Sequence, residues 1–169
     1  MRTGGGIRST SPNHIYLRTY GIYPRPPLYL RRLFPYLRTG CSALSRDGGS
    51  VLFRHIEELF PSLFFVAEND AGNIIGYILG GIHLEDSATG KLIRIGVVPN
   101  YQRRECGTKL TGTLFAEMKR RVVTAVHLTV AETNTPAITF YKKIGFVQKE
   151  RIAEYFYPAT PRLVLWKTL

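Results

Sequence analysis

The stretch Leu92-Ile-Arg-Ile-Gly-Val-Val-Pro-Asn-Tyr-Gln-Arg-Arg-Glu-Cys-Gly-Thr-Lys-Leu110 determines how the rest of this chain is interpreted. It begins with alternating apolar residues, Ile93, Ile95 and Val97, which is typical of a β-strand with one buried face. A proline and an asparagine then end the strand, because proline cannot continue a sheet ladder. We therefore expect a strand followed by a turn.

The second half of the stretch is polar and basic, and it leads into an amphipathic helix. Leu110, Leu114 and Met118 recur at helical spacing, and Gly107 lies in the segment before them. The first backbone amides of a helix have no helical partner, and the helix dipole favours an anion there. A strand, a short basic loop and a helix N-terminus can hold phosphates, although an ordinary turn with a solvated basic face has the same spacing.

Residues Val97 to Gly107 resemble the acetyl-CoA signature of the GNAT superfamily of N-acetyltransferases. That signature is a strand ending in Val-x-Pro, followed by Tyr-Gln/Arg-Arg-x-Gly-x-Gly at the start of a helix. At one point the chain differs, because Glu105 replaces the first glycine. The chain matches the signature at Val97, Pro99, Tyr101, Gln102, Arg103 and Gly107.

A second block, from Val130 to Phe146, resembles the superfamily pattern Val-x-x-x-Asn-x-x-Ala-Ile-x-Phe/Leu-Tyr-x-x-x-Gly-Phe. The resemblance implies that Asn134 hydrogen-bonds the cofactor. It also implies that Tyr141 presents its hydroxyl to the thioester sulfur as general acid. A tyrosine on the inner face of a helix is otherwise usually a core residue.

The resemblance also implies how acetyl-CoA, as co-substrate, is held. Backbone groups of Ile95, Gly96 and Val97 would pair with the pantetheine arm. We expect Glu105 to weaken cofactor binding rather than abolish it, since glycine allows a closer approach to phosphate but the amide donor survives. The pyrophosphate would be wrapped by Arg103, Arg104, Glu105, Cys106, Gly107 and Thr108. Cys106, beside arginines at a helix N-terminus, is either a reactive thiol or, as is more usual, a packed apolar side chain.

The general base is not evident. Within the superfamily the chain most resembles the ribosomal-protein N-terminal acetyltransferases and their archaeal relatives, which commonly place a glutamate or histidine base in the strand before the asparagine. Thr129 occupies that position here and cannot act as a base. Glu132, just beyond the strand, and His127, which is more often a packed strand residue, are the alternatives. Late paired aromatics, Phe156 and Tyr157, resemble those near the peptide groove of these enzymes.

A site with a poor base should favour acceptors that are already deprotonated. An α-amino group with a pKa of about 8 is roughly one-fifth unprotonated at about pH 7.4, whereas a lysine of pKa about 10.4 is only about one-thousandth so. We therefore predict acetyl transfer to the N-terminal amine of a protein or peptide by direct attack in a ternary complex. The alternatives are a small-molecule amine acetyltransferase, a catalytically weak acyl-CoA-binding regulatory protein and, least favoured, a nucleic-acid-binding protein.

Length and composition fit one globular domain. The chain has 169 residues, of which 44% are hydrophobic, and its charges are scattered. No apolar run reaches the roughly 18 residues of a membrane span, and the N-terminus lacks the apolar core of a secretory signal. Cys41 and Cys106 form no disulfide framework, which fits a reducing cytoplasm. No metal site is predicted.

The net charge of +11 is unevenly spread. Residues 1 to 54 hold nine arginines, no lysine and one acid, Asp47. Such an arm could contact RNA, a ribosome or an anionic membrane surface, or it could be a solvated segment of a chain that is basic throughout. The arginines show no recognisable RNA-binding pattern, which favours the solvated segment.

The order of predicted elements indicates a mixed α/β domain. We expect a disordered lead-in at 1–13 and a single GNAT-like domain at 14–169. The resemblance implies a central twisted sheet of six to seven strands, mixed but mostly antiparallel, with helices on both faces. Predicted strands are 14–20, 63–67, 74–82, 92–98, 125–131, 146–151 and 163–167; predicted helices are 28–37, 51–60, 107–121 and a last one with Thr135 as N-cap and Gly145 as the C′ residue.

Overall fold

The computed structural model describes residues 15–19, 61–155 and 160–169. The helices predicted at 28–37 and 51–60 and the aromatic pair at 156–157 lie outside these residues. In chain order the elements are β1 (Tyr16–Thr19), η1 (Pro61–Leu63), β2 (Phe64–Glu68), β3 (Ile74–Ile82), β4 (Thr89–Val97), η2 (Pro99–Tyr101), α3 (Cys106–Arg120), β5 (Ala125–Ala131), α4 (Thr135–Lys143), β6 (Val147–Ile152) and β7 (Arg162–Thr168).

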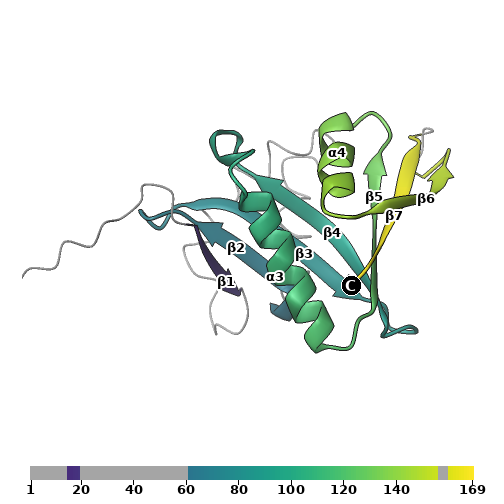
Figure 1. The fold of residues 1–169 in the computed structure, drawn as a ribbon, viewed down its shortest axis with the longest axis horizontal. Coiled ribbons are helices and arrows are strands. Elements are labelled where there is room, and N and C mark those ends of the chain that lie inside the picture. The colour runs from purple at the N-terminus through teal and green to yellow at the C-terminus, as the bar shows by residue number, and fades with distance from the viewer. Residues whose placement is uncertain (1–14, 20–60, 156–159) are drawn as a thin grey trace, which may run out of the picture.

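Seven strands form one sheet in the order β1-β2-β3-β4-β5-β7-β6. Every neighbouring pair is antiparallel except β4 and β5, which run parallel. Figure 1 shows α3 lying across β2 to β4, with α4 near the region where β4 and β5 separate. This is the mixed, mostly antiparallel sheet that the sequence predicts. Neither α3 nor α4 is long and apolar enough to cross a membrane.

Helix α3 covers the sheet with the apolar stripe that its sequence predicts. Leu110, Leu114 and Met118 have no exposed surface. Gly80 on β3 allows the helix to come close, since a Cβ there would lie 2.7 Å from a methyl group of Leu114. Residues of α4, β5 and β7 complete the same core cluster, so one core fixes both helices relative to the strands.

Strand β4, which contains the start of the stretch from Leu92 to Leu110, departs from a simple alternation of buried and exposed side chains. The β3–β4 register shifts between Leu79 and Gly80, so that Ile93 is an extra residue opposite that step. Ile93 is 41% exposed, whereas Leu92 is buried and Ile95 packs against the core. The prediction that Ile93 shares a buried face with Ile95 is therefore wrong, because a β-bulge reverses the alternation at that point.

Both ends of α4 are capped by local hydrogen bonds. The N-cap is Asn134, whose Oδ1 accepts from the backbone amide of Ala137 at 3.2 Å. The predicted N-cap, Thr135, is instead the first helical residue, since the asparagine oxygen reaches the free amide first. Gly145 has a φ of 94° and lies at C′ as predicted.

Candidate active site

Strands β4 and β5 diverge after a short parallel ladder. Their last paired residues are Lys91 and His127, yet β4 continues to Val97 and β5 to Ala131. Beyond Lys91, β4 makes no ladder with β5 in the described part of the chain. The backbone predicted to pair with pantetheine, at Ile95, Gly96 and Val97, lies on this diverging segment. An extended thioester arm can therefore add to the β4 edge there.

The glycine on this segment is required by its neighbour on β3. A Cβ on Gly96 would lie 2.5 Å from the ring of Tyr77. Tyr77 is itself buried and meets Phe64 edge-on at 6.4 Å. The aromatic pair thus leaves room for only a glycine at position 96 of β4. This close packing holds the strand in place beside the candidate site for the cofactor arm.

The N-terminus of α3 follows the divergence directly and presents unbonded amides. Glu105 is the N-cap, and its side chain makes no capping bond. The first helical bond runs from the Lys109 amide to the Glu105 carbonyl, so the amides of Cys106, Gly107 and Thr108 have no acceptor within the helix and can bind an anion. Gly107 lies against α4, where an added Cβ would be 3.2 Å from Phe140. The exposed side chains of this turn include Arg103, Arg104 and Lys109.

The glutamate that replaces the signature glycine adopts a glycine-like backbone. Glu105 has φ 63° and ψ −4°, and Arg103 also has a positive φ of 61°. The left-handed region costs a non-glycine residue roughly 1–2 kcal/mol. The glycine in the signature therefore matches a real backbone requirement, which Glu105 meets with a left-handed conformation.

Cys106 is a packed thiol and not a reactive one. It is 1% exposed, and its Sγ lies 3.2 Å from where a Cβ on Gly76 would be. Burial raises the pKa of the Cys106 thiol to about 11, although the charge of Lys109 opposes the shift. The thiolate is therefore absent near neutral pH, and the packed interpretation is confirmed.

Tyr141 is held by the C-terminal cap of its own helix. The amide of Phe146 donates to the Tyr141 carbonyl at 3.0 Å, and the amide of Gly145 donates to Lys142 at 3.0 Å, which is a Schellman motif. The Tyr141 and Phe146 rings meet edge-on at 5.7 Å. Burial raises the pKa of Tyr141 to about 12, with the charge of Arg162 acting against it. The phenol thus keeps its proton and can donate it.

Asn134 is the N-cap of the same helix, and its backbone amide donates to the Ala131 carbonyl at the end of β5 at 2.9 Å. The cap uses its Oδ1, which leaves the Nδ2 amide as a possible donor to the cofactor. Its predicted contact with acetyl-CoA is therefore compatible with its structural role.

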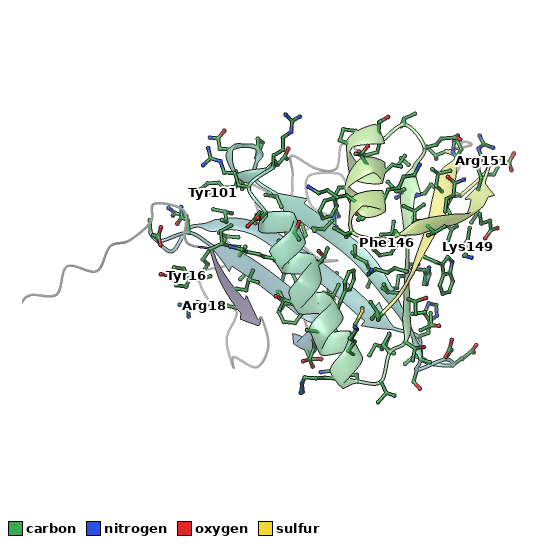
Figure 2. All side chains as sticks on the ribbon, in the orientation of Figure 1. Tyr16, Arg18, Tyr101, Phe146, Lys149 and Arg151 are labelled. Atoms are coloured by element: carbon green, nitrogen blue, oxygen red, sulfur yellow. The ribbon has the colours of Figure 1, made fainter. Side chains whose placement is uncertain are left out.

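Both carboxylate oxygens of Glu132 are held in an ion pair with Arg151. Arg151 on β6 (Figure 2) donates from Nε to Oε1 at 2.9 Å and from Nη2 to Oε2 at 2.8 Å. The hydrogen bonds and charge of Arg151 lower the pKa of the Glu132 carboxyl. A carboxylate stabilised in this way is a weaker proton acceptor, so the geometry counts against the predicted role of Glu132 as base.

His127, which forms the last β4–β5 pair with Lys91, packs in an aromatic cluster. Its Nε2 lies 2.8 Å from that of His83, and its ring stacks on Trp166 at 4.9 Å. Burial, followed by the charges of Lys91 and His83, lowers its pKa. The packed interpretation of this histidine fits these contacts.

Sequence reasoning missed Arg162, the first residue of β7. Its Nη2 donates to the Thr129 carbonyl at 3.1 Å, and its guanidinium lies over the Tyr155 ring at 5.5 Å. The signal in the sequence was one arginine directly before the apolar run from Leu163 to Leu165. That signal does not reveal its neighbours, which come from β5 and the β6–β7 connection.

Solved structures with this fold include several acetyltransferases. Ard1 from Thermoplasma volcanium superposes with a TM-score of 0.78 at 20% identity, over 92% of this chain and 97% of that one. The ribosomal-protein-S18-alanine N-acetyltransferase from Escherichia coli gives 0.72 at 19% identity, over 92% and 94%. These likenesses show that the fold is shared.

Similarity in sequence extends to curated enzymes. The N-terminal acetyltransferase B complex catalytic subunit NAA20 of Arabidopsis thaliana is 32% identical over 134 residues, which is 70% of this chain and 76% of that protein. An N-alpha-acetyltransferase of Sulfurisphaera tokodaii is 35% identical over 113 residues, 60% of this chain and 66% of its own. Residues 29–146 match the model of the acetyltransferase (GNAT) family. The chain therefore belongs to the GNAT family and is an N-acetyltransferase that uses acetyl-CoA as co-substrate.

Proposed function

We propose that the acceptor is the α-amino group of a protein or peptide N-terminus. The observation that carries this proposal is the state of the candidate bases. Thr129 stands at the usual base position, and Glu132 is held by Arg151. Among the described residues of the site, no carboxylate is placed to deprotonate a lysine ammonium. An α-amine, with a pKa of about 8, needs much less help. The names of the relatives above, which are N-terminal acetyltransferases, also support it.

Each of the residues named above has a separate role in acetyl transfer. The amides of Cys106, Gly107 and Thr108 would hold the pyrophosphate, and β4 would align the arm that carries the acetyl group. The uncharged amine attacks the thioester carbonyl carbon, a C–N bond forms and the C–S bond breaks. Tyr141, which stays protonated at neutral pH, gives its proton to the leaving sulfur, and the nitrogen loses one of its two protons through solvent to restore the Tyr141 phenol. Because acetyl-CoA supplies the activated acetyl group, the protein contributes positioning and this proton.

Two further features of the proposal concern the cellular compartment of the enzyme and the charge of its N-terminal segment. The buried free thiol of Cys106 is consistent with a reducing compartment such as the cytoplasm. The arginine-rich segment of residues 1–54 would attract a polyanion such as ribosomal RNA, although its arginines show no recognisable RNA-binding pattern, which favours a solvated segment.

The test compares three acceptors at equal concentration, with thiol release from acetyl-CoA as the readout. The first is a peptide with a free α-amine and no lysine. The second is the same peptide with a blocked N-terminus and one added lysine, and the third is a polyamine. We expect the first to react about 100-fold faster or more, in line with the difference in unprotonated fraction. Faster acetylation of the lysine peptide or the polyamine would refute the proposed acceptor, and faster acetylation of the polyamine would favour the small-molecule alternative.

A further inference from the structure

Arg162 brings a positive charge to the position that lacks a base. It begins β7, pairs with Ala131 at the end of β5, and donates from Nη2 to the Thr129 carbonyl at 3.1 Å. Its guanidinium lies over the Tyr155 ring at 5.5 Å, and the residue is only partly exposed. The cation is thus fixed against the strand segment from which related enzymes present a base.

The charge of Arg162 also acts on the proposed general acid. It opposes the effect of burial on the pKa of Tyr141, so the guanidinium and the phenol share one electrostatic environment. Glu132 and Arg151 are the charged groups of the adjacent β5–α4 turn and β6, and they neutralise each other as a pair. Glu154 lies exposed in the turn after β6.

We propose that Arg162 sets the protonation state of the acceptor: its charge, held on the Thr129 carbonyl, disfavours a bound ammonium and favours the neutral amine. This inference rests on the proposed α-amine acceptor. A like charge lowers the pKa of an ammonium because repulsion destabilises the charged form. The ammonium releases one proton to solvent. The neutral nitrogen then forms the C–N bond as the C–S bond breaks, and Tyr141 protonates the sulfur. The nitrogen now carries two protons; water transfers one of them to the Tyr141 phenolate, and the other stays on the amide. Arg162 is a positioning residue, because it acts through the amine and Tyr141.

The experiment measures kcat and kcat/KM against pH for four proteins: the unaltered chain, Arg162→Gln, Arg162→Lys and Arg120→Gln. The last variant removes one exposed arginine of α3, whose Nε lies 3.5 Å from a carboxylate oxygen of Glu117, and serves as the matched control. The acceptor is the lysine-free peptide with a free α-amine, at saturating acetyl-CoA. The kcat profile reports groups in the bound complex, whereas kcat/KM reports the free peptide and enzyme.

In Arg162→Gln we expect the rising limb of the kcat profile to move to higher pH by about one unit. The corresponding limb of kcat/KM should stay at the pKa of the free amine. Arg162→Lys should restore the limb, because it keeps the charge, and Arg120→Gln should match the unaltered chain.

A loss of kcat by the same factor at every pH in Arg162→Gln, or a limb that does not move, would overturn the inference and leave Arg162 a structural residue. Failure of the unaltered chain on the peptide is a different result, since it refutes the proposed acceptor. The same four profiles are then measured on whichever amine is acetylated, and the same shift is required there. If no amine is acetylated by the unaltered chain, both proposals fail.

Discussion

Glu132 and Arg151 are joined by two parallel hydrogen bonds, 2.9 and 2.8 Å long, between the end of β5 and strand β6. The pair fixes the β5–α4 turn to the edge hairpin, next to the cap at Asn134. The backbone reinforces this connection, because the Glu132 amide donates to the Pro161 carbonyl at 3.3 Å. A carboxylate in this arrangement positions the edge of the site and is poorly suited to accept protons.

Replacement of Glu132 by glutamine should therefore leave catalysis nearly intact. We expect kcat to fall by no more than a few-fold, whereas loss of a general base typically costs about 10²–10⁴-fold. Steady-state kinetics with the lysine-free peptide provides the measurement, and Arg151→Gln provides the matched control because it removes the other half of the pair. If Glu132→Gln alone loses more than about 100-fold while Arg151→Gln does not, Glu132 is the base after all.

Replacement of Glu105 by glycine should both stabilise the protein and tighten acetyl-CoA binding. Glycine adopts a φ of 63° without the cost of roughly 1–2 kcal/mol that a side chain incurs there. It also removes a carboxylate from a turn whose amides would face phosphate. Denaturant unfolding measures the first effect, and calorimetric titration of acetyl-CoA measures the second.

Val122 offers the matched control for this pair of effects. It has a φ of 64° at the other end of α3 and is 77% exposed. Val122→Gly should therefore stabilise the fold by a similar amount and leave the affinity for acetyl-CoA unchanged. Equal gains in affinity for both variants would mean that stability, and not the phosphate turn, governs binding.

The sequence predicted most of this fold because its signals are local. The strand at 74–82 follows from an apolar run directly after a hairpin turn, and the strand at 125–131 and the apolar face of α3 follow from their own patterns of apolar residues. The exposed position of Ile93 does not, since a β-bulge depends on the partner strand and leaves no mark in the alternation of one strand. Arg162 was missed for a related reason: Thr129 and Tyr155 approach it only through tertiary pairing, and a single arginine before an apolar run is unremarkable.

The thiol of Cys106 should be inert in the folded protein. In a Cys41→Ser variant, where it is the remaining cysteine, we expect no measurable reaction with an aromatic disulfide at about pH 8, because the thiol pKa is about 11 and the thiolate is the nucleophile. One equivalent should react at once after denaturation. Rapid reaction of the native variant would mean that the loop above Cys106 opens readily.

Tyr141→Phe should separate the chemical role of the hydroxyl from the packing of its ring. The ring keeps its edge-on contact with Phe146 at 5.7 Å, so the fold should persist while kcat falls by about 10²–10⁴-fold and KM changes little. In the unaltered chain, kcat should show no alkaline fall due to this group until the pH approaches the Tyr141 pKa of about 12.

The same shift predicts how stability depends on pH. Because burial raises the pKa of Tyr141 from 10.0 to about 12, the folded state retains a proton that the unfolded chain loses. Its contribution is therefore complete below pH 10 and is lost as the pH rises toward 12. Cys106, raised from 9.0 to about 11, adds a loss of the same sign at slightly lower pH. Tyr141→Phe should show a shallower alkaline decline in the free energy of unfolding than the unaltered chain. An equal decline in the two proteins would place the alkaline loss in other groups and contradict the buried, protonated state of Tyr141.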